Sequence, residues 1–287
     1  LPRLGPNGSF RDQAGDPVCF LLMIMDFRSS SASRLAGRLA ASITLALLAL
    51  LCLLPLSGQA QNSGIVLGRP TDTSVTASIL LGTATDLYIE YSTTSGGPYT
   101  KQTATTTAEA NVPLEVLVSG LMGDTRYYYR LETRPPGSGP FTPSPEYTFH
   151  TQRAKGSTFT FTVQADPHLD FGTEPAMYRQ SLTNALAAQP DFFVDLGDTF
   201  MTDKYTDFKL AAPQYLAQRF YFGLLGHSAP VFLVLGNHDG ESPGRGGDTT
   251  MADWSNAMRK KYFPNPEPNG FYTGNATPRG TNGKLQD

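Results

Sequence analysis

The chain has little cysteine, little histidine and no excess of positive charge. Its 287 residues include two cysteines and four histidines, and 22 basic against 25 acidic residues give a formal net charge of −3. Both cysteines, Cys19 and Cys52, precede residue 60, so the rest of the chain has no disulfide and no thiolate metal site. The acidic balance excludes nucleic-acid binding by charge, and a phosphate-bearing substrate would have to be drawn by bound cations.

The first part of the chain has the pattern of an export signal. Residues 39–56 are almost uninterruptedly apolar, follow Arg34 and Arg38, and precede a stretch of small residues. This order is typical of a signal peptide, here residues 25–60, and predicts a periplasmic or extracellular protein that meets the membrane only during export. An uncleaved anchor is the alternative, since about 18 apolar residues are near the lower limit for a membrane span.

Residues 1–24 are interpreted as upstream sequence translated in error. The chain begins with Leu1, and a signal peptide normally has only a short charged segment before its apolar core, so Met25 is the expected start. Residues 1–60 hold five basic and three acidic residues; the 17 basic and 22 acidic residues that remain give a net charge of −5.

Residues 61–152 are rich in Thr, Ser, Val and Tyr, with short alternating runs such as 87–91 and 116–118. Short strands separated by turn residues predict an antiparallel β-sandwich. Residues 121–131 resemble the tyrosine corner and penultimate strand of fibronectin type III domains, with Tyr127 as the corner tyrosine that bonds back to the backbone.

A different pattern begins at Thr158, and it predicts a second domain over residues 153–287. The expected elements are strands at 159–165, 192–196 and 231–235, helices at 176–188 and 206–222, and a Pro-, Asn- and Gly-rich loop at 264–287. Apolar strands separated by helices predict a sheet built from βαβ units, whose ligands bind beyond the carboxyl ends of the strands.

Three short motifs follow these three predicted strands: Asp166-Pro167-His168, Gly197-Asp198 and Gly236-Asn237-His238-Asp239. In an extended segment residues two apart point the same way, so Asp166 and His168 can present a carboxylate and an imidazole to one cation. Asp198 can bridge two metal ions, or alternatively N-cap a short helix that begins at Thr199.

The third motif is the most specific of the three. Asn237 offers a neutral oxygen ligand, His238 is placed to protonate a leaving oxygen, and Asp239 can orient that imidazole. A turn built from Gly, Asn and Asp is the alternative for this motif alone. The three motifs in this order, each at a strand end, favour a single site.

These motifs carry a resemblance to a known family. Residues 158–241 resemble the first half of a calcineurin-like metallophosphoesterase, a four-layer αββα fold, and residues 64–287 resemble secreted bacterial members with a fibronectin-like first domain. The resemblance implies two divalent metal ions, bound through Asp166 and His168 on one, Asp198 between both and Asn237 on the second, with His238 and Asp239 as catalytic residues. It further implies hydrolysis of a phosphate monoester or diester by metal-bound hydroxide.

The chain departs from that family in two ways. Purple acid phosphatases have a tyrosine where Met201 stands and usually a glycine at His168, which argues against iron–tyrosinate and favours Mn²⁺, Fe²⁺ or Zn²⁺. No histidine follows His238, so the family's later histidine and closing GHxH segment have no counterpart. The chain is therefore expected to be a fragment that is inactive alone. The alternative is a noncatalytic exported surface or binding protein with a degenerate phosphoesterase scaffold.

The remaining candidates are given structural roles. His150 and His227 are predicted to be surface or turn histidines. Glu241, Arg245 and Asp248 follow the last motif and are predicted to lie in a solvated loop, with a substrate rim as the alternative.

Overall fold

A computed structural model describes residues 64–169, 173–241 and 249–274, all of them within one compact unit, Gln61–Asp287. The predicted upstream segment and signal peptide lie outside the described residues, as do Arg245 and Asp248. Within the described part of the chain, no helix is long and apolar enough to cross a membrane.

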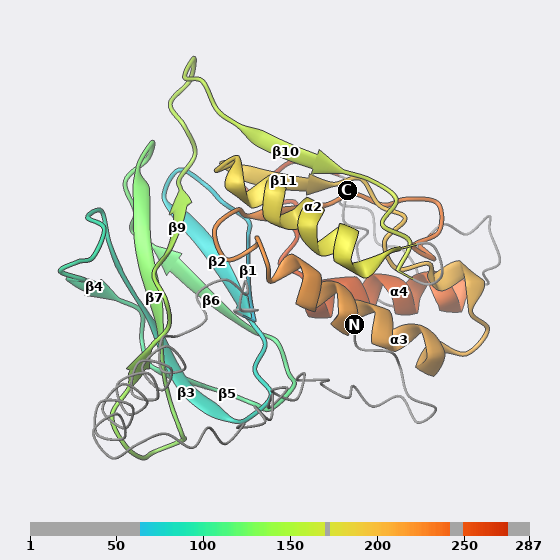
Figure 1. Cartoon of the computed structure of the whole chain (residues 1–287), viewed down its shortest axis with the longest axis horizontal. Helices are drawn as coiled ribbons and strands as arrows, with labels where there is room; N and C mark the ends of the chain where they lie inside the picture. Colours follow the sequence, from blue (N-terminus) through green and yellow to red (C-terminus); the bar gives the residue numbers. More distant parts are fainter. Residues whose placement is uncertain (1–63, 170–172, 242–248, 275–287) are drawn as a thin grey trace, which may run out of the picture. The chain divides into compact units, whose positions relative to one another are not determined.

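The first half of the described chain consists of two antiparallel sheets (Figure 1). One has the strand order β1-β2-β6, with β1 at Ile65–Gly68, β2 at Ser74–Ile79 and β6 at Leu114–Ser119. The other has the order β4-β3-β7-β8, with β5 paired to β3 and β9 paired to β7. Its strands are β3 (Thr85–Ser92), β4 (Lys101–Gln102), β5 (Thr106–Ala108), β7 (Arg126–Arg134), β8 (Thr142–Pro143) and β9 (Tyr147–His150). This is the predicted β-sandwich.

Side-chain alternation along the strands builds the sandwich core. In β6, Val116 and Val118 are buried whereas Leu117 between them is 60% exposed. Tyr127 is buried and accepts a hydrogen bond from the backbone N–H of Met122 at 2.9 Å. The predicted tyrosine corner is confirmed by that bond.

The second half is a parallel sheet with helices. Strands β10 (Phe161–Gln164), β11 (Phe192–Asp195) and β12 (Val231–Leu233) pair in that order, and α2 (Pro175–Ala187), the 3₁₀ turn η1 (Thr202–Lys204) and α3 (Phe208–Phe222) connect them. Each predicted strand and helix is present, with its ends within two residues of the predicted ends. The sequence therefore placed all three strand ends, and with them the motifs, correctly.

One helix, α4 (Thr249–Tyr262), was not predicted. Its buried side chains include Met251 and Ala252, but also Ser255, Asn256 and Arg259. Because its buried stripe is half polar, the segment has few apolar residues to mark it as a helix in the sequence.

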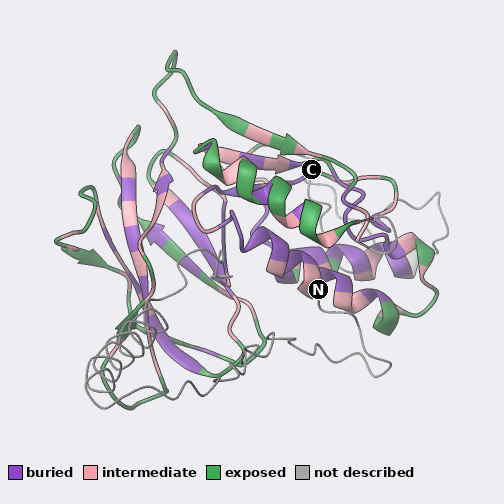
Figure 2. Cartoon of the chain, viewed as in Figure 1, coloured by how far each residue is buried: buried purple, intermediate pink, exposed green. Residues whose placement is uncertain are grey.

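The two faces of the parallel sheet differ. On one face Phe193 and Leu233 are buried in a cluster with side chains of α2 and α3. On the other face Phe161 and Val163 are each 49% exposed, and the rings of Phe161 and Phe192 stack 5.3 Å apart. Figure 2 shows β10 in the colours of exposed and partly exposed residues along its length. The described residues thus form one helix layer and one sheet layer of the predicted four-layer domain.

Arg219 of α3 links the parallel-sheet half to the sandwich. Its guanidinium is almost fully buried and donates to the carbonyl oxygens of Gly64 and Ser78, at 2.8 and 2.9 Å, and to that of Tyr262 at 3.2 Å. Burial lowers the pKa of Arg219 to about 9. Backbone carbonyl oxygens of both halves thus surround this guanidinium.

Candidate metal centre

The first motif lies in a strained loop rather than in an extended segment. Asp166 and His168 follow β10 and both have left-handed backbone, with φ of 56° and 44°. The N–H groups of Asp166 and His168 donate to the carbonyl oxygens of Gly197 and Asp198, at 3.0 and 3.2 Å. The expectation of extended backbone was wrong, but the loop still brings both side chains toward one point. Left-handed conformations of residues other than glycine persist where the surroundings enforce them, often at functional sites.

The second motif turns sharply at the end of β11. Gly197 has φ of 94°, and a Cβ there would lie 2.0 Å from the backbone nitrogen of Gly236, so only glycine fits. Asp198 is also left-handed, with φ of 54°, and η1 begins only at Thr202. The alternative that Asp198 caps a helix starting at Thr199 is therefore wrong.

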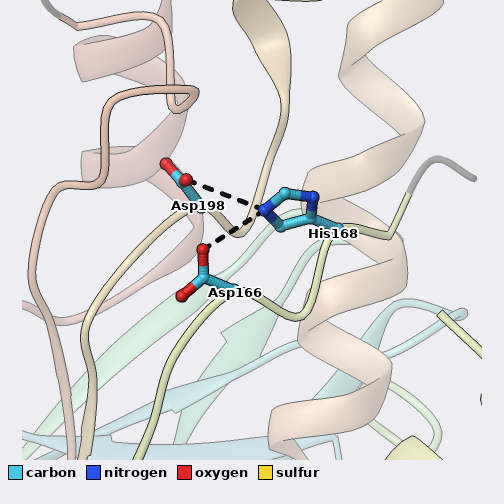
Figure 3. A group of neighbouring side chains, drawn as sticks. All are labelled: Asp166, His168 and Asp198. Carbon is cyan, nitrogen blue, oxygen red and sulfur yellow. Dashed lines mark ion pairs between the residues drawn. The ribbon is translucent and has the colours of Figure 1, made fainter. Parts of the chain in front are cut away.

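Asp166, His168 and Asp198 converge (Figure 3). One ligand atom from each lies within 4.8 Å of the others. His168 Nε2 is 3.4 Å from Asp166 Oδ1 and 3.7 Å from Asp198 Oδ2, which is too long for a good hydrogen bond. That nitrogen is buried and has no hydrogen-bond partner among the described residues. A buried imidazole nitrogen flanked by two carboxylates fits a divalent cation, because the cation supplies the missing partner.

His238 pairs with an acid that the sequence analysis did not name. Its Nδ1 lies 2.7 Å from Asp203 Oδ2, and the Asp203 N–H donates to the His238 carbonyl oxygen at 3.3 Å. The rings of His238 and His168 are 5.8 Å apart, so the pair adjoins the three converging side chains. Asp203 lies in η1, which follows the left-handed residue Met201. Because the backbone is irregular there, the spacing of residues in the sequence does not predict this contact.

Asp239 does not orient His238, and that prediction was wrong. Its buried carboxylate accepts four backbone N–H groups instead. Oδ2 accepts from Asp198 at 3.0 Å and Gly236 at 2.7 Å, and Oδ1 accepts from Thr199 at 2.8 Å and Phe200 at 2.9 Å. Asp239 thus ties the third motif to the backbone of the second.

Asn237 is exposed in the turn after β12, next to His238, whose N–H donates to Asp198 Oδ1 at 2.8 Å. The backbone of the third motif is thereby joined to the candidate metal group. The role of Asn237 as a ligand stays a prediction.

Asp195, at the end of β11, holds the loop that carries Asp198. Its Oδ1 accepts from the Gly197 N–H at 3.0 Å and the Thr199 hydroxyl at 2.6 Å, and its Oδ2 accepts from Gln164 Nε2 at 2.6 Å. Burial raises the pKa of Asp195 to about 6, against the lowering effect of these donors. Asp195 was not predicted, because a buried acid inside an apolar strand matches no motif.

Glu241 is buried, which corrects the prediction of a solvated loop. Its carboxylate accepts from Arg259 Nε at 2.7 Å and from Asn256 Nδ2 at 2.9 Å, both on α4. The chain after the third motif is therefore held by a buried ion pair.

The two histidines outside the motifs have structural contacts. His227 lies in a turn as predicted, but its ring packs 4.4 Å from that of Tyr147, and burial lowers its pKa to about 4. His150 ends β9, and its Nδ1 lies 2.7 Å from the Thr151 carbonyl oxygen. Both side chains are more enclosed than a surface histidine.

Comparisons with known proteins agree with this fold. The family model for calcineurin-like phosphoesterases matches residues 159–283. None of the curated proteins compared with the chain matches it. The solved structure of PhoD superimposes with a TM-score of 0.51 and 17% sequence identity, covering 75% of this chain and 48% of PhoD. This chain therefore spans about half the length of that structure, and the likeness concerns the fold alone.

Two further matches concern the sandwich. A fibronectin type III domain derived from the human KIAA0970 protein has a TM-score of 0.25 and 14% identity, covering 35% of this chain and 81% of that domain. The sensor domain of the anti-sigma factor RsgI4 from Pseudobacteroides cellulosolvens has 0.24 and 14%, covering 31% and 74%. These scores are too low to support an argument, so the sandwich assignment rests on strand pairing and the tyrosine corner. Family match and fold agree on the second half: the chain carries a calcineurin-like phosphoesterase domain, matched over residues 159–283, behind a fibronectin type III-like β-sandwich.

Proposed function

We propose that this chain takes part in the metal-dependent hydrolysis of a phosphate ester, with Asp166, His168 and Asp198 as metal ligands. The buried His168 Nε2, which lacks a hydrogen-bond partner among the described residues, carries the proposal. It faces two carboxylate oxygens at 3.4 and 3.7 Å, and one imidazole with two carboxylates is a donor set that suits Mn²⁺, Fe²⁺ or Zn²⁺. The family match supplies the reaction class.

In the proposed site Asp166, His168, Asp198 and Asn237 would hold two divalent ions. Such a pair, when bound, lowers the pKa of water and stabilises charge on the phosphoryl oxygens. The carboxylates of Asp166 and Asp198 would bind these cations. The predicted exported part of the protein carries a net charge of −5, which also attracts cations. A phosphate ester is then attracted to the cations rather than to the protein surface. Both monoesters and diesters fit this description.

His238 is the proposed general acid. Asp203 occupies its Nδ1 at 2.7 Å, which fixes the ring orientation and leaves Nε2 for the substrate. With Nδ1 turned to Asp203, a proton at Nε2 can be transferred to the leaving oxygen. Asp203 is accordingly a positioning residue in this proposal.

Export is also proposed, on the strength of the signal pattern in residues 25–60. A periplasmic or extracellular enzyme would meet its ester and its metal ions outside the cytoplasm. Detection of a mature amino terminus near residue 61 in the exported fraction would test this.

The test of function compares Asp198→Asn with Asp191→Asn. Asp198 lies at the carboxyl end of β11, while Asp191 precedes the same strand and pairs with Arg153 at 2.9 Å, so the two variants change an acid at opposite ends of one strand. Mn²⁺ binding is measured on this chain by calorimetry. Hydrolysis of p-nitrophenyl phosphate and bis(p-nitrophenyl) phosphate is measured on protein from the complete reading frame.

Asp198→Asn is expected to abolish metal binding and turnover, whereas Asp191→Asn keeps both. Turnover that survives unchanged in Asp198→Asn would sink the metal-site assignment. Equal losses in both variants would point to general destabilisation instead.

A further inference from the structure

We propose that Asp239 is a positioning residue that aims the Asp198 carboxylate at the candidate metal group, without acting on His238. This inference rests on the proposed metal-dependent function. It assigns a task to an acid whose carboxylate hydrogen-bonds to backbone N–H groups of the second and third motifs.

The Asp239 carboxylate is enclosed by backbone donors. Three consecutive N–H groups, those of Asp198, Thr199 and Phe200, point at its two oxygens, and the N–H of Gly236 completes the set. Successive backbone N–H groups that curve around an anion form a concave binding site, and bonds to an ionised acceptor are stronger than those between neutral groups. Asp239 therefore fixes the path of residues 198–200.

The backbone of that segment needs such support. Gly197, Asp198 and Met201 all have positive φ, at 94°, 54° and 49°. For Asp198 and Met201 this conformation is strained, and strain of this kind persists only where the surroundings enforce it. The four bonds to Asp239 supply the constraint at Asp198.

Fixing the backbone also fixes which Asp198 oxygen faces the candidate metal group. Oδ1 accepts the N–H of His238 at 2.8 Å, and Oδ2 is the oxygen 3.7 Å from His168 Nε2. Both constraints come from adjacent residues of one motif, since Asp239 holds the Asp198 backbone while the His238 N–H holds its carboxylate. A shift of this motif would therefore move the proposed bridging ligand.

The two loops are packed too closely to absorb such a shift. A Cβ on Gly236 would lie 2.2 Å from Asp198 Oδ1, and a Cβ on Gly197 would lie 2.0 Å from the Gly236 nitrogen. The backbones touch at two glycines. Displacement at Asp239 is thus transmitted to Asp198.

Asp239→Asn is the sharpest perturbation. Each carboxylate oxygen accepts two N–H groups, so an amide in either orientation places its NH₂ against two donors. Loss of an outer residue that orients a metal ligand typically weakens metal binding about 10–100-fold. We expect that loss in Mn²⁺ affinity, with an altered Mn²⁺ electron paramagnetic resonance spectrum and an unchanged far-ultraviolet circular dichroism spectrum.

Glu241→Gln is the matched control. Glu241 and Asp239 are both 2% exposed, but the Glu241 carboxylate bonds to Arg259 and Asn256 of α4 rather than to the site backbone. This variant is expected to lower the unfolding temperature while Mn²⁺ affinity and spectrum stay those of the wild type. Equal weakening of Mn²⁺ binding in both variants would show a merely structural role and overturn the inference.

Asp198→Asn separates this inference from the proposed function. If the full chain binds no Mn²⁺, or if Asp198→Asn binds it as tightly as the wild type does, the metal site fails and the positioning role fails with it. If Asp198→Asn loses binding but Asp239→Asn keeps it, only the positioning role fails. Should Asp239→Asn not fold, Asp239→Glu keeps the charge and displaces the oxygens. Weakened Mn²⁺ binding in Asp239→Glu supports the inference, and wild-type binding overturns it.

Discussion

The stability of the phosphoesterase domain should fall between about pH 4 and pH 6 because of Asp195. Burial raises the pKa of this carboxyl group from 3.8 to about 6. The unfolded chain loses the proton near pH 3.8, whereas the folded protein keeps it until about pH 6, so the folded state binds more protons in this window. Its contribution to stability is present below pH 3.8 and is lost as the pH rises through 6.

The size of the effect follows from the two pKa values. A difference of about two units corresponds to about 3 kcal/mol of unfolding free energy. Asp195→Asn keeps the group neutral at every pH. The amide oxygen of the substituted side chain can accept from Gly197 and Thr199. The NH₂ of the same side chain can donate to Gln164 if the Gln164 amide rotates and places its oxygen where Nε2 now lies. Tyr178, whose hydroxyl lies 2.9 Å from Gln164 Nε2, can donate to that oxygen after the rotation.

Urea denaturation at a series of pH values, with a chelator present to exclude metal binding, measures this effect. The stability of Asp195→Asn relative to the wild type should grow by up to about 3 kcal/mol from pH 4 to 6 and then level off. Thr199→Val removes a hydroxyl that donates to Asp195 Oδ1 at 2.6 Å and lowers its pKa. The loss of stability in that variant should extend to higher pH. A difference between wild type and Asp195→Asn that does not vary with pH would refute the reasoning.

Three further outcomes are expected. Asp203→Asn weakens the hold on His238 Nδ1 and should lower kcat for p-nitrophenyl phosphate about tenfold while Mn²⁺ affinity stays constant; equal kcat would remove Asp203 from the mechanism. Arg219→Met removes the buried guanidinium that donates to the carbonyl oxygens of Gly64 and Ser78 and should cost about 3 kcal/mol in urea denaturation, so an unchanged midpoint would contradict the linking role. Phe161→Ser combined with Val163→Ser should reduce the fluorescence of a bound hydrophobic dye, because both side chains are 49% exposed on one sheet face; equal fluorescence would place the dye elsewhere.

Short apolar runs made the strands predictable from sequence. In β11 and β12 these runs are bounded by turn residues, and glycine at the strand end marks where the backbone must turn. Helix α4 escaped prediction because Ser255, Asn256 and Arg259 occupy its buried face. Glu241, the partner of Asn256 and Arg259, comes before the helix in the chain. A buried polar stripe cannot be distinguished from a solvated one by periodicity alone.

The candidate site shows the same division between what sequence reveals and what it hides. The spacing of motifs brought Asp166, His168 and Asp198 together correctly, because parallel strands end at one edge. Sequence could not say which acid serves His238. Asp239 is adjacent to it, yet Asp203 makes the contact, since the left-handed Met201 and the turn after it redirect the chain. Adjacency in sequence predicts the direction of a side chain only where the backbone is regular.

Five acids near these strand ends fall into two groups, according to whether hydrogen-bond donors of the fold satisfy their carboxylate oxygens. Asp195 and Asp239 are saturated by backbone and side-chain donors, and Asp203 has the His238 ring. Asp166 and Asp198 instead present oxygens 3.4 and 3.7 Å from one imidazole nitrogen, too far for a good hydrogen bond. Donors that hold the first group are internal to the fold, so those acids keep their places without a ligand. A divalent cation fits the second group, because two carboxylates and an imidazole nitrogen are a donor set that such ions bind.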